Sequence, residues 1–116
     1  MTRDDIKLLK FAAKAVGEYY GEWQVSDAFR IWYEDLHEWN PLADDGDAFR
    51  LAVKLGLLIN CETCYYTSVL KDCVSITEHI GNDGSGCIYA ATRRAIVRAA
   101  AEIGRRKAPQ ALRRRK

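Results

Sequence analysis

Hydrophobic residues recur every three to four positions in three stretches of the chain, and each stretch predicts an amphipathic helix. The first begins at the capping residue Thr2 and is expected to end at Gly17. The second is short and is expected to end at Gly56, while the third covers residues 89–103 and is expected to end at Gly104. Each helix is expected to turn its apolar face toward a shared core.

Between the helices the hydrophobic period shortens to two residues, which predicts strands. Residues 23–33 alternate around a central turn and predict a β-hairpin. Residues 35–43 contain Pro41 and are expected to form a connecting loop. Residues 57–67 and 73–80 predict two further strands, and the first of them is expected to be buried on both faces because it begins with a continuous apolar run.

This order of elements predicts the fold class. Helices alternate with pairs of strands, so we expect one α/β (α+β) domain, a helix-sheet-helix sandwich of three helices and an antiparallel or mixed sheet of about four strands. The domain is expected to comprise residues 1–104, followed by residues 105–116 as a flexible basic arm. A length of 116 residues, 48% of them hydrophobic, suits a single core.

Two features of the sequence predict how the protein relates to membranes and where in the cell it is located. No apolar run approaches the ~20 residues that a membrane span requires, so no membrane is expected as a partner. The first residues, MTRDD, lack the basic and apolar regions of a secretory signal, which predicts a cytoplasmic location. The pattern does not determine the oligomeric state, and a homodimer stays an open alternative.

Charge is distributed unevenly although the formal net charge is only +2. Residues 1–92 carry a net charge of −7, and residues 93–116 carry +9. Such a separation creates a field that can orient charged partners. The basic residues expected to bind a partner or a nucleic acid are Arg93, Arg94, Arg98, Arg105, Arg106, Lys107, Arg113, Arg114, Arg115 and Lys116.

Three acidic residues, Asp44, Asp45 and Asp47, crowd the start of the second helix. We interpret them as helix-capping residues, because carboxylates at a helix N-terminus accept hydrogen bonds from free N–H groups and oppose the helix dipole. A calcium loop would need more oxygen ligands at wider spacing. No metal site is predicted here.

Four cysteines invite a zinc interpretation: Cys61 and Cys64 form a C-x-x-C, followed by Cys73 and Cys87. Side chains three residues apart on a strand point to opposite faces, which disfavours a zinc knuckle and favours small buried thiols. Whether the four cysteines approach one another is left open. A redox role for the C-x-x-C is also disfavoured, because the pair lies within a predicted strand.

The glycine-rich residues 81–86 precede the last helix and resemble a phosphate cradle, with Arg93 and Arg94 nearby, but they match no nucleotide-binding fingerprint. His37 and His79 are the two histidines of the chain, and neither lies in a recognisable catalytic motif. We therefore expect a non-enzyme without a cofactor.

Two longer segments carry a family resemblance. Residues 39–55, WNPLADDGDAFRLAVKL, and residues 91–104, ATRRAIVRAAAEIG, resemble the signature segments of a family of small bacteriophage-encoded proteins, the phage αβα-sandwich domain. The similarity extends over residues 4–106, and the chain departs from it most in residues 57–86 and after Lys107. The resemblance implies a phage or prophage origin and a location in the cytoplasm of the bacterial host, and it supplies no catalytic residues to carry over to this chain.

Three hypotheses about function follow. The family resemblance implies a non-enzymatic phage accessory protein that binds a host protein and thereby modulates or inhibits a host defence system. The alternative is a nucleic-acid-binding protein that uses the basic last helix and the C-terminal arm. A second alternative is a binder of a nucleotide signal or another small molecule at the glycine loop.

Overall fold

The computed structural model describes residues 3–20, 23–25, 31–33, 37–62, 65–80 and 87–107. In chain order the elements are α1 (Arg3–Tyr20), β1 (Trp23–Val25), β2 (Ile31–Tyr33), β3 (His37–Trp39), α2 (Asp45–Leu55), β4 (Leu58–Glu62), β5 (Tyr66–Lys71), β6 (Val74–His79) and α3 (Ile88–Lys107). The three expected helices are confirmed, and all strands pair in antiparallel fashion.

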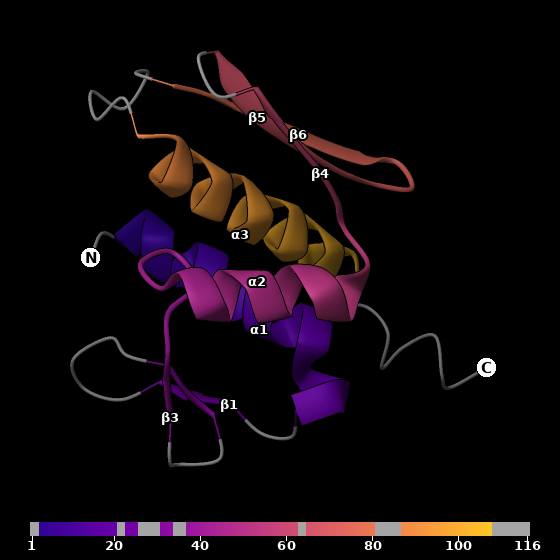
Figure 1. The fold of residues 1–116 in the computed structure, drawn as a ribbon. Coiled ribbons are helices and arrows are strands. Elements are labelled where there is room, and N and C mark those ends of the chain that lie inside the picture. Colours follow the sequence, from indigo (N-terminus) through magenta and orange to yellow (C-terminus); the bar gives the residue numbers. More distant parts are fainter. Residues whose placement is uncertain are drawn as a thin grey trace.

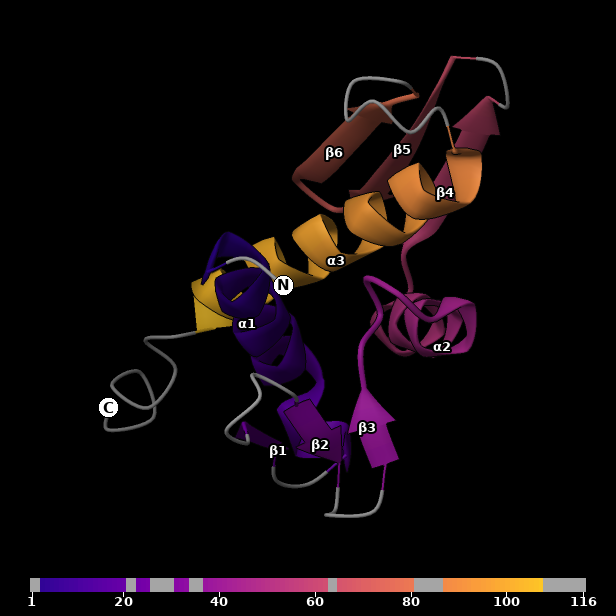
Figure 2. The ribbon, with the colours of Figure 1, turned by 90° about the vertical axis from the view of Figure 1, so that its left-hand side faces the viewer.

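Helix α3 is the central element of the molecule. One side of it packs on β5 and β6, and the other side packs on α1 and α2 (Figure 1). The core draws large side chains from four elements, since Leu9, Leu51, Val69 and Val97 are all at most 1% exposed. An α/β arrangement in layers is thus confirmed, with the β4–β6 sheet on one side of the helices and the β1–β3 sheet on the other (Figure 2).

The expected single sheet of about four strands is wrong, because the strands form two separate three-stranded sheets. The hairpin expected in residues 23–33 is confirmed as β1 and β2. A third strand, β3, lies where a loop was expected, and it pairs with β2. Pro41 does not prevent this strand, because β3 ends at Trp39 and the proline follows in a turn.

The strand expected over residues 57–67 is also wrong, because the chain reverses within it. β4 ends at Glu62, the Tyr65 N–H donates to the Glu62 carbonyl oxygen at 2.9 Å, and β5 returns beside β4. The expected burial on both faces fails as well: β4 is an edge strand, and Leu58 is 65% exposed. No glycine or proline signals this turn in the sequence.

The β4–β6 sheet has one covered and one uncovered face. Val74, Ile76 and Glu78 alternate with the exposed Ser75, Thr77 and His79 along β6, and α3 covers the first set. The opposite side, which we call the outer face, is covered by no element within the described ranges. Strand register places these residues on it: Leu58, Asn60, Glu62, Tyr66, Ser68, Leu70, Ser75, Thr77 and His79.

Gly104 does not end the last helix. α3 continues through it to Lys107, so the first three residues of the expected arm are helical, and residues 108–116 lie outside the described residues. Gly104 is buried where α1 and α3 cross, and a Cβ built on it would lie 1.8 Å from the Phe11 carbonyl oxygen. The glycine therefore permits a close approach of two helices. Gly17 likewise lies within α1, since glycine is tolerated inside a helix at a modest cost.

Candidate nucleic-acid interface

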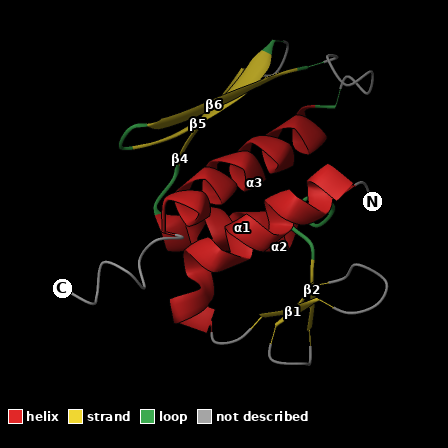
Figure 3. Ribbon diagram, turned by 180° about the vertical axis from the view of Figure 1, so that it is seen from behind, coloured by secondary structure: helices red, strands yellow, loops and turns green. Residues whose placement is uncertain are grey.

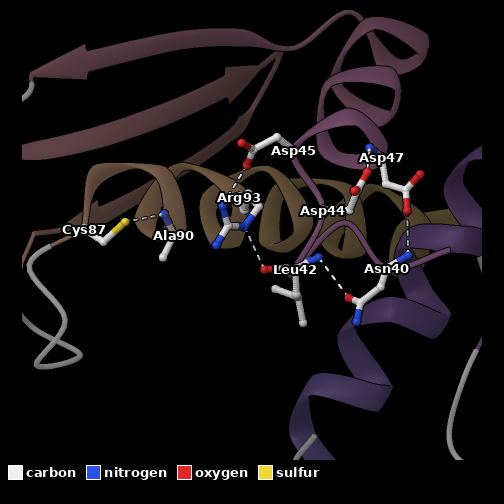
Figure 4. A network of polar contacts seen from close by, with 8 residues as sticks. All are labelled: Asn40, Leu42, Asp44, Asp45, Asp47, Cys87, Ala90 and Arg93. Carbon is white, nitrogen blue, oxygen red and sulfur yellow. Dashed lines mark hydrogen bonds and ion pairs between the residues drawn. The ribbon is translucent and has the colours of Figure 1, made fainter.

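Arg93 fixes the start of α2 to α3. Its Nε donates to the Leu42 carbonyl oxygen at 2.9 Å, and its Nη1 lies 2.7 Å from Oδ1 of Asp45 (Figure 4). The arginine side chain is only 21% exposed, whereas that of Asp45 is 72% exposed. The guanidinium therefore serves as a link within the fold and is not a free cation.

The next two basic residues of α3 are also held by carboxylates. Arg94 lies 3.0 Å from Oδ1 of Asp5 at the start of α1, and Arg98 lies 2.5 Å from Oε2 of Glu78 on β6. Both acidic side chains are less than 20% exposed. A phosphate that binds either arginine would have to compete with a carboxylate already in place.

At the C-terminal end of α3 the balance of charge changes. Arg105 and Arg106 both contact the same carboxylate, that of Glu102, so one negative charge faces two positive ones. Arg106 also donates to the Cys73 sulfur at 3.0 Å. The contact with Cys73 raises the pKa of Arg106 above its ordinary value, and the Glu102 carboxylate has a smaller effect in the same direction, so the guanidinium stays charged. Excess positive charge therefore accumulates at this end of the helix.

The structure shows a second group of cations that was not predicted from the sequence. We call it the α1 cation row: four exposed side chains on one side of α1, namely Arg3, Lys7, Lys10 and Lys14. Within the part of the chain that the structure describes, none of them forms an ion pair. Their spacing of four, three and four residues is the signal that could have revealed them.

The aspartates at the start of α2 stabilise that helix. Asp44 is the N-cap residue, and its side chain accepts a hydrogen bond from the Asp47 N–H at 2.8 Å (Figure 4). Asp47 in turn accepts from the Asn40 N–H at 2.9 Å and pairs with Arg50. Together with Asp45, which binds Arg93, these carboxylates are used within the fold.

The three cysteines that the structure describes form no disulfide with one another and have different contacts. The Cys61 sulfur lies 3.5 Å from Oγ1 of Thr67, Cys73 contacts Arg106, and the Cys87 sulfur accepts from the Ala90 N–H. All three are free thiols, but their expected burial is wrong, because Cys61 and Cys73 are exposed and Cys87 is half-buried. Cys64 lies outside the described residues. Among the residues with described positions, no group of three or more His, Cys, Asp or Glu side chains is placed to hold a metal ion.

Some of the remaining predictions concern described residues, and others lie outside the described residues. The glycine loop, residues 81–86, lies outside the described residues, as do Arg113, Arg114, Arg115 and Lys116. His79 lies on the exposed end of β6, with its ring centroid 6.3 Å from that of Tyr66. None of the helices in the described ranges is long and apolar enough to span a membrane.

Comparisons of the chain with protein-family models, with curated proteins and with solved structures each found no match. The resemblance of residues 39–55 and 91–104 to the phage αβα-sandwich family therefore stays a prediction. The geometry of the basic surfaces carries the functional argument instead.

Proposed function

We propose that the protein is a non-enzymatic nucleic-acid-binding protein that contacts phosphates with the basic C-terminal end of the chain. The observation that carries this proposal is the pairing of charges along α3. Arg93, Arg94 and Arg98 each have a carboxylate of their own, whereas Arg105 and Arg106 share one. After Glu102 the sequence contains seven Lys and Arg residues and no acidic residue.

Physical chemistry supports phosphate as the ligand of such a segment. Each cation that neutralises a phosphate releases a condensed counterion, and this release drives binding at low salt without sequence specificity. Four acidic residues of the body, Asp5, Asp45, Asp47 and Glu78, are held in ion pairs with arginines of α3 and α2, which limits the repulsion that these four exert on a polyanion at the C-terminal end.

The test is a charge-neutralised full-length variant, R113Q/R114Q/R115Q, measured by fluorescence anisotropy with a labelled 20-base-pair duplex. The matched control is R50Q/K54Q/K71Q, which removes the same charge from α2 and β5. We expect the C-terminal variant to lose affinity and to reduce the steepness of the plot of log K against log salt by about 3, because each phosphate contact contributes about 0.9. Equal affinity of this variant and the wild-type protein would refute the proposal.

A second candidate function is the binding of a host protein, and the outer face of the β4–β6 sheet favours it. This face carries Tyr66 beside His79 and a row of small polar residues, a composition found in adaptable protein-binding surfaces. Leu58 adds an exposed apolar side chain at its edge. A phage or prophage origin and an action on a host defence system would accompany this function.

Affinity capture from a bacterial lysate, with and without nuclease, separates the two candidates. A protein partner retained after nuclease treatment, lost with L58E/T77E and kept with F49E on α2 would support the second function. The nucleotide-binding alternative is weaker, because both arginines it requires, Arg93 and Arg94, are engaged by aspartates.

A further inference from the structure

The α1 cation row is a straight array of positive charge on the solvent side of the helix. Four residues at spacings of four, three and four fall within about 60° of the helix circumference, since each residue advances the helix by roughly 100°. The row extends about 16 Å at ~1.5 Å per residue. The buried residues Leu9, Ala12 and Val16 lie on the opposite side of α1, toward the core.

This row meets the basic end of α3 at Phe11. The Nζ atom of Lys14 lies 5.8 Å from the centroid of the Phe11 ring, and the Cζ atom of Arg105 lies 5.1 Å from the same centroid. Gly104 brings the two backbones together at this point. Figure 3 shows α1 beside the C-terminal end of α3. Two basic segments that are about 90 residues apart in sequence therefore share one surface.

We propose that the α1 cation row and Arg105 form a binding surface for the phosphates of a nucleic-acid duplex. This inference rests on the proposed function and extends it to a surface that the charge distribution of the sequence did not indicate. A polyanion is the occupant that matches the charge, because the row has no carboxylate paired to it within the described residues.

The geometry favours a duplex over a single strand. Proteins that bind single strands stack bases on exposed aromatic rings, whereas sequence-independent duplex binding needs phosphate contacts alone. Among the side chains that the structure describes on α1, the aromatic ring is that of Phe11, which is half-buried and already lies near two cations. The exposed Tyr89 lies at the other end of α3, about 22 Å from Gly104 at ~1.5 Å per residue.

Neighbouring cations of the row are separated by about one helical turn, ~5.4 Å along the axis. Lysine acts as a point charge on a long flexible stem, so successive side chains can reach successive phosphates without a fixed base register. The row is therefore suited to position the protein on a backbone and not to read bases.

The test uses the full-length variant K7Q/K10Q/K14Q with the same control, R50Q/K54Q/K71Q, and circular dichroism to verify that both fold. We expect the α1 variant to bind a 20-base-pair duplex on the order of 100-fold more weakly at 0.1 M salt and to lower the salt slope by about 3. The control is expected to retain the wild-type affinity. The duplex is expected to bind at least as tightly as a single strand of equal length.

The other outcomes distinguish failure of this inference from failure of the proposed function. If the α1 variant keeps the wild-type affinity and slope while R113Q/R114Q/R115Q loses them, this inference fails and the proposed function stands. If the wild-type chain does not bind a duplex at 50 mM salt, the proposed function fails as well. Binding confined to single strands, or to vesicles that contain an anionic phospholipid, would overturn the assignment of a duplex.

Discussion

Replacement of Gly104 with alanine tests the central packing contact of the fold. The added Cβ would lie 1.8 Å from the Phe11 carbonyl oxygen, 2.8 Å from the Phe11 carbonyl carbon and 3.1 Å from the Ala15 nitrogen. All three atoms belong to the backbone of α1, so no side-chain rotation relieves the contact. The two helices would have to separate over the length of their crossing.

The magnitude follows from two opposed effects. Overpacking of a well-packed core costs about 1–3 kcal/mol, and a contact with backbone belongs at the upper end of that range. Alanine stabilises a helix interior by about 1 kcal/mol relative to glycine. We therefore expect G104A to lower the free energy of unfolding by about 2 kcal/mol, and the midpoint of thermal unfolding by about 8 °C at ~4 °C per kcal/mol.

The matched control is G46A in α2, where a Cβ would lie 3.2 Å from the Asp44 carboxylate and 3.3 Å from the Arg50 guanidinium. These are ends of flexible side chains, so G46A is expected to change stability by less than about 1 kcal/mol. The assay is urea and thermal denaturation followed by circular dichroism. A G104A protein as stable as the wild type, or more stable, would show that α1 and α3 do not cross at this glycine.

Three further substitutions test local features. D44A is expected to cost about 1 kcal/mol by removing the N-cap of α2, whereas D44N should restore most of it; equal urea midpoints for D44A and wild type would contradict the capping role. R93A is expected to lower the free energy of unfolding by about 1–2 kcal/mol and D45A by less than about 0.5 kcal/mol, because the exposed ion pair contributes little and the hydrogen bond to Leu42 contributes more. A larger loss for D45A than for R93A in chemical denaturation would be inconsistent with this contact. D72V is expected to lower the free energy of unfolding by about 1–2 kcal/mol in thermal denaturation, whereas D72G is tolerated, because Asp72 has a φ of 51° in the β5–β6 turn. Equal stability of the two variants would argue against this backbone conformation.

Periodicity in the sequence was sufficient for the elements whose local signals agree with their environment. Helix α2 has aspartates at its start and Gly56 at its end, where the left-handed φ of 67° requires a residue of this kind. The hairpin of β1 and β2 likewise follows from alternation. Local chemistry and tertiary structure favour the same conformation in these segments.

The wrong predictions concern segments whose conformation depends on contacts with distant parts of the chain. Gly104 was interpreted as a helix stop, but it is required by the approach of α1, which no local pattern reveals. The turn between β4 and β5 contains no glycine or proline within residues 61–65, so a single long strand was expected. The burial of β4 was misjudged because its position at an edge depends on the pairing of the other strands.

The candidate interface was predicted only in part. The asymmetry of charge identified the C-terminal residues, but it could not distinguish Arg93, Arg94 and Arg98, which are held in ion pairs, from the cations beyond Glu102. The α1 cation row was not predicted because Asp4, Asp5 and Glu18 of the same helix offset three of its four charges when charge is counted along the sequence. Its position beside Arg105 results from the crossing of α1 and α3.

The affinity of the full-length protein for a duplex of arbitrary sequence, followed from 50 to 200 mM salt, tests the binding surface most directly. With five contacts from the α1 cation row and Arg105, the association constant is expected to fall by about 10²- to 10³-fold over this range, and further contacts from the C-terminal segment make the fall steeper. An association constant that does not change with salt, or the absence of binding at 50 mM, would contradict the account.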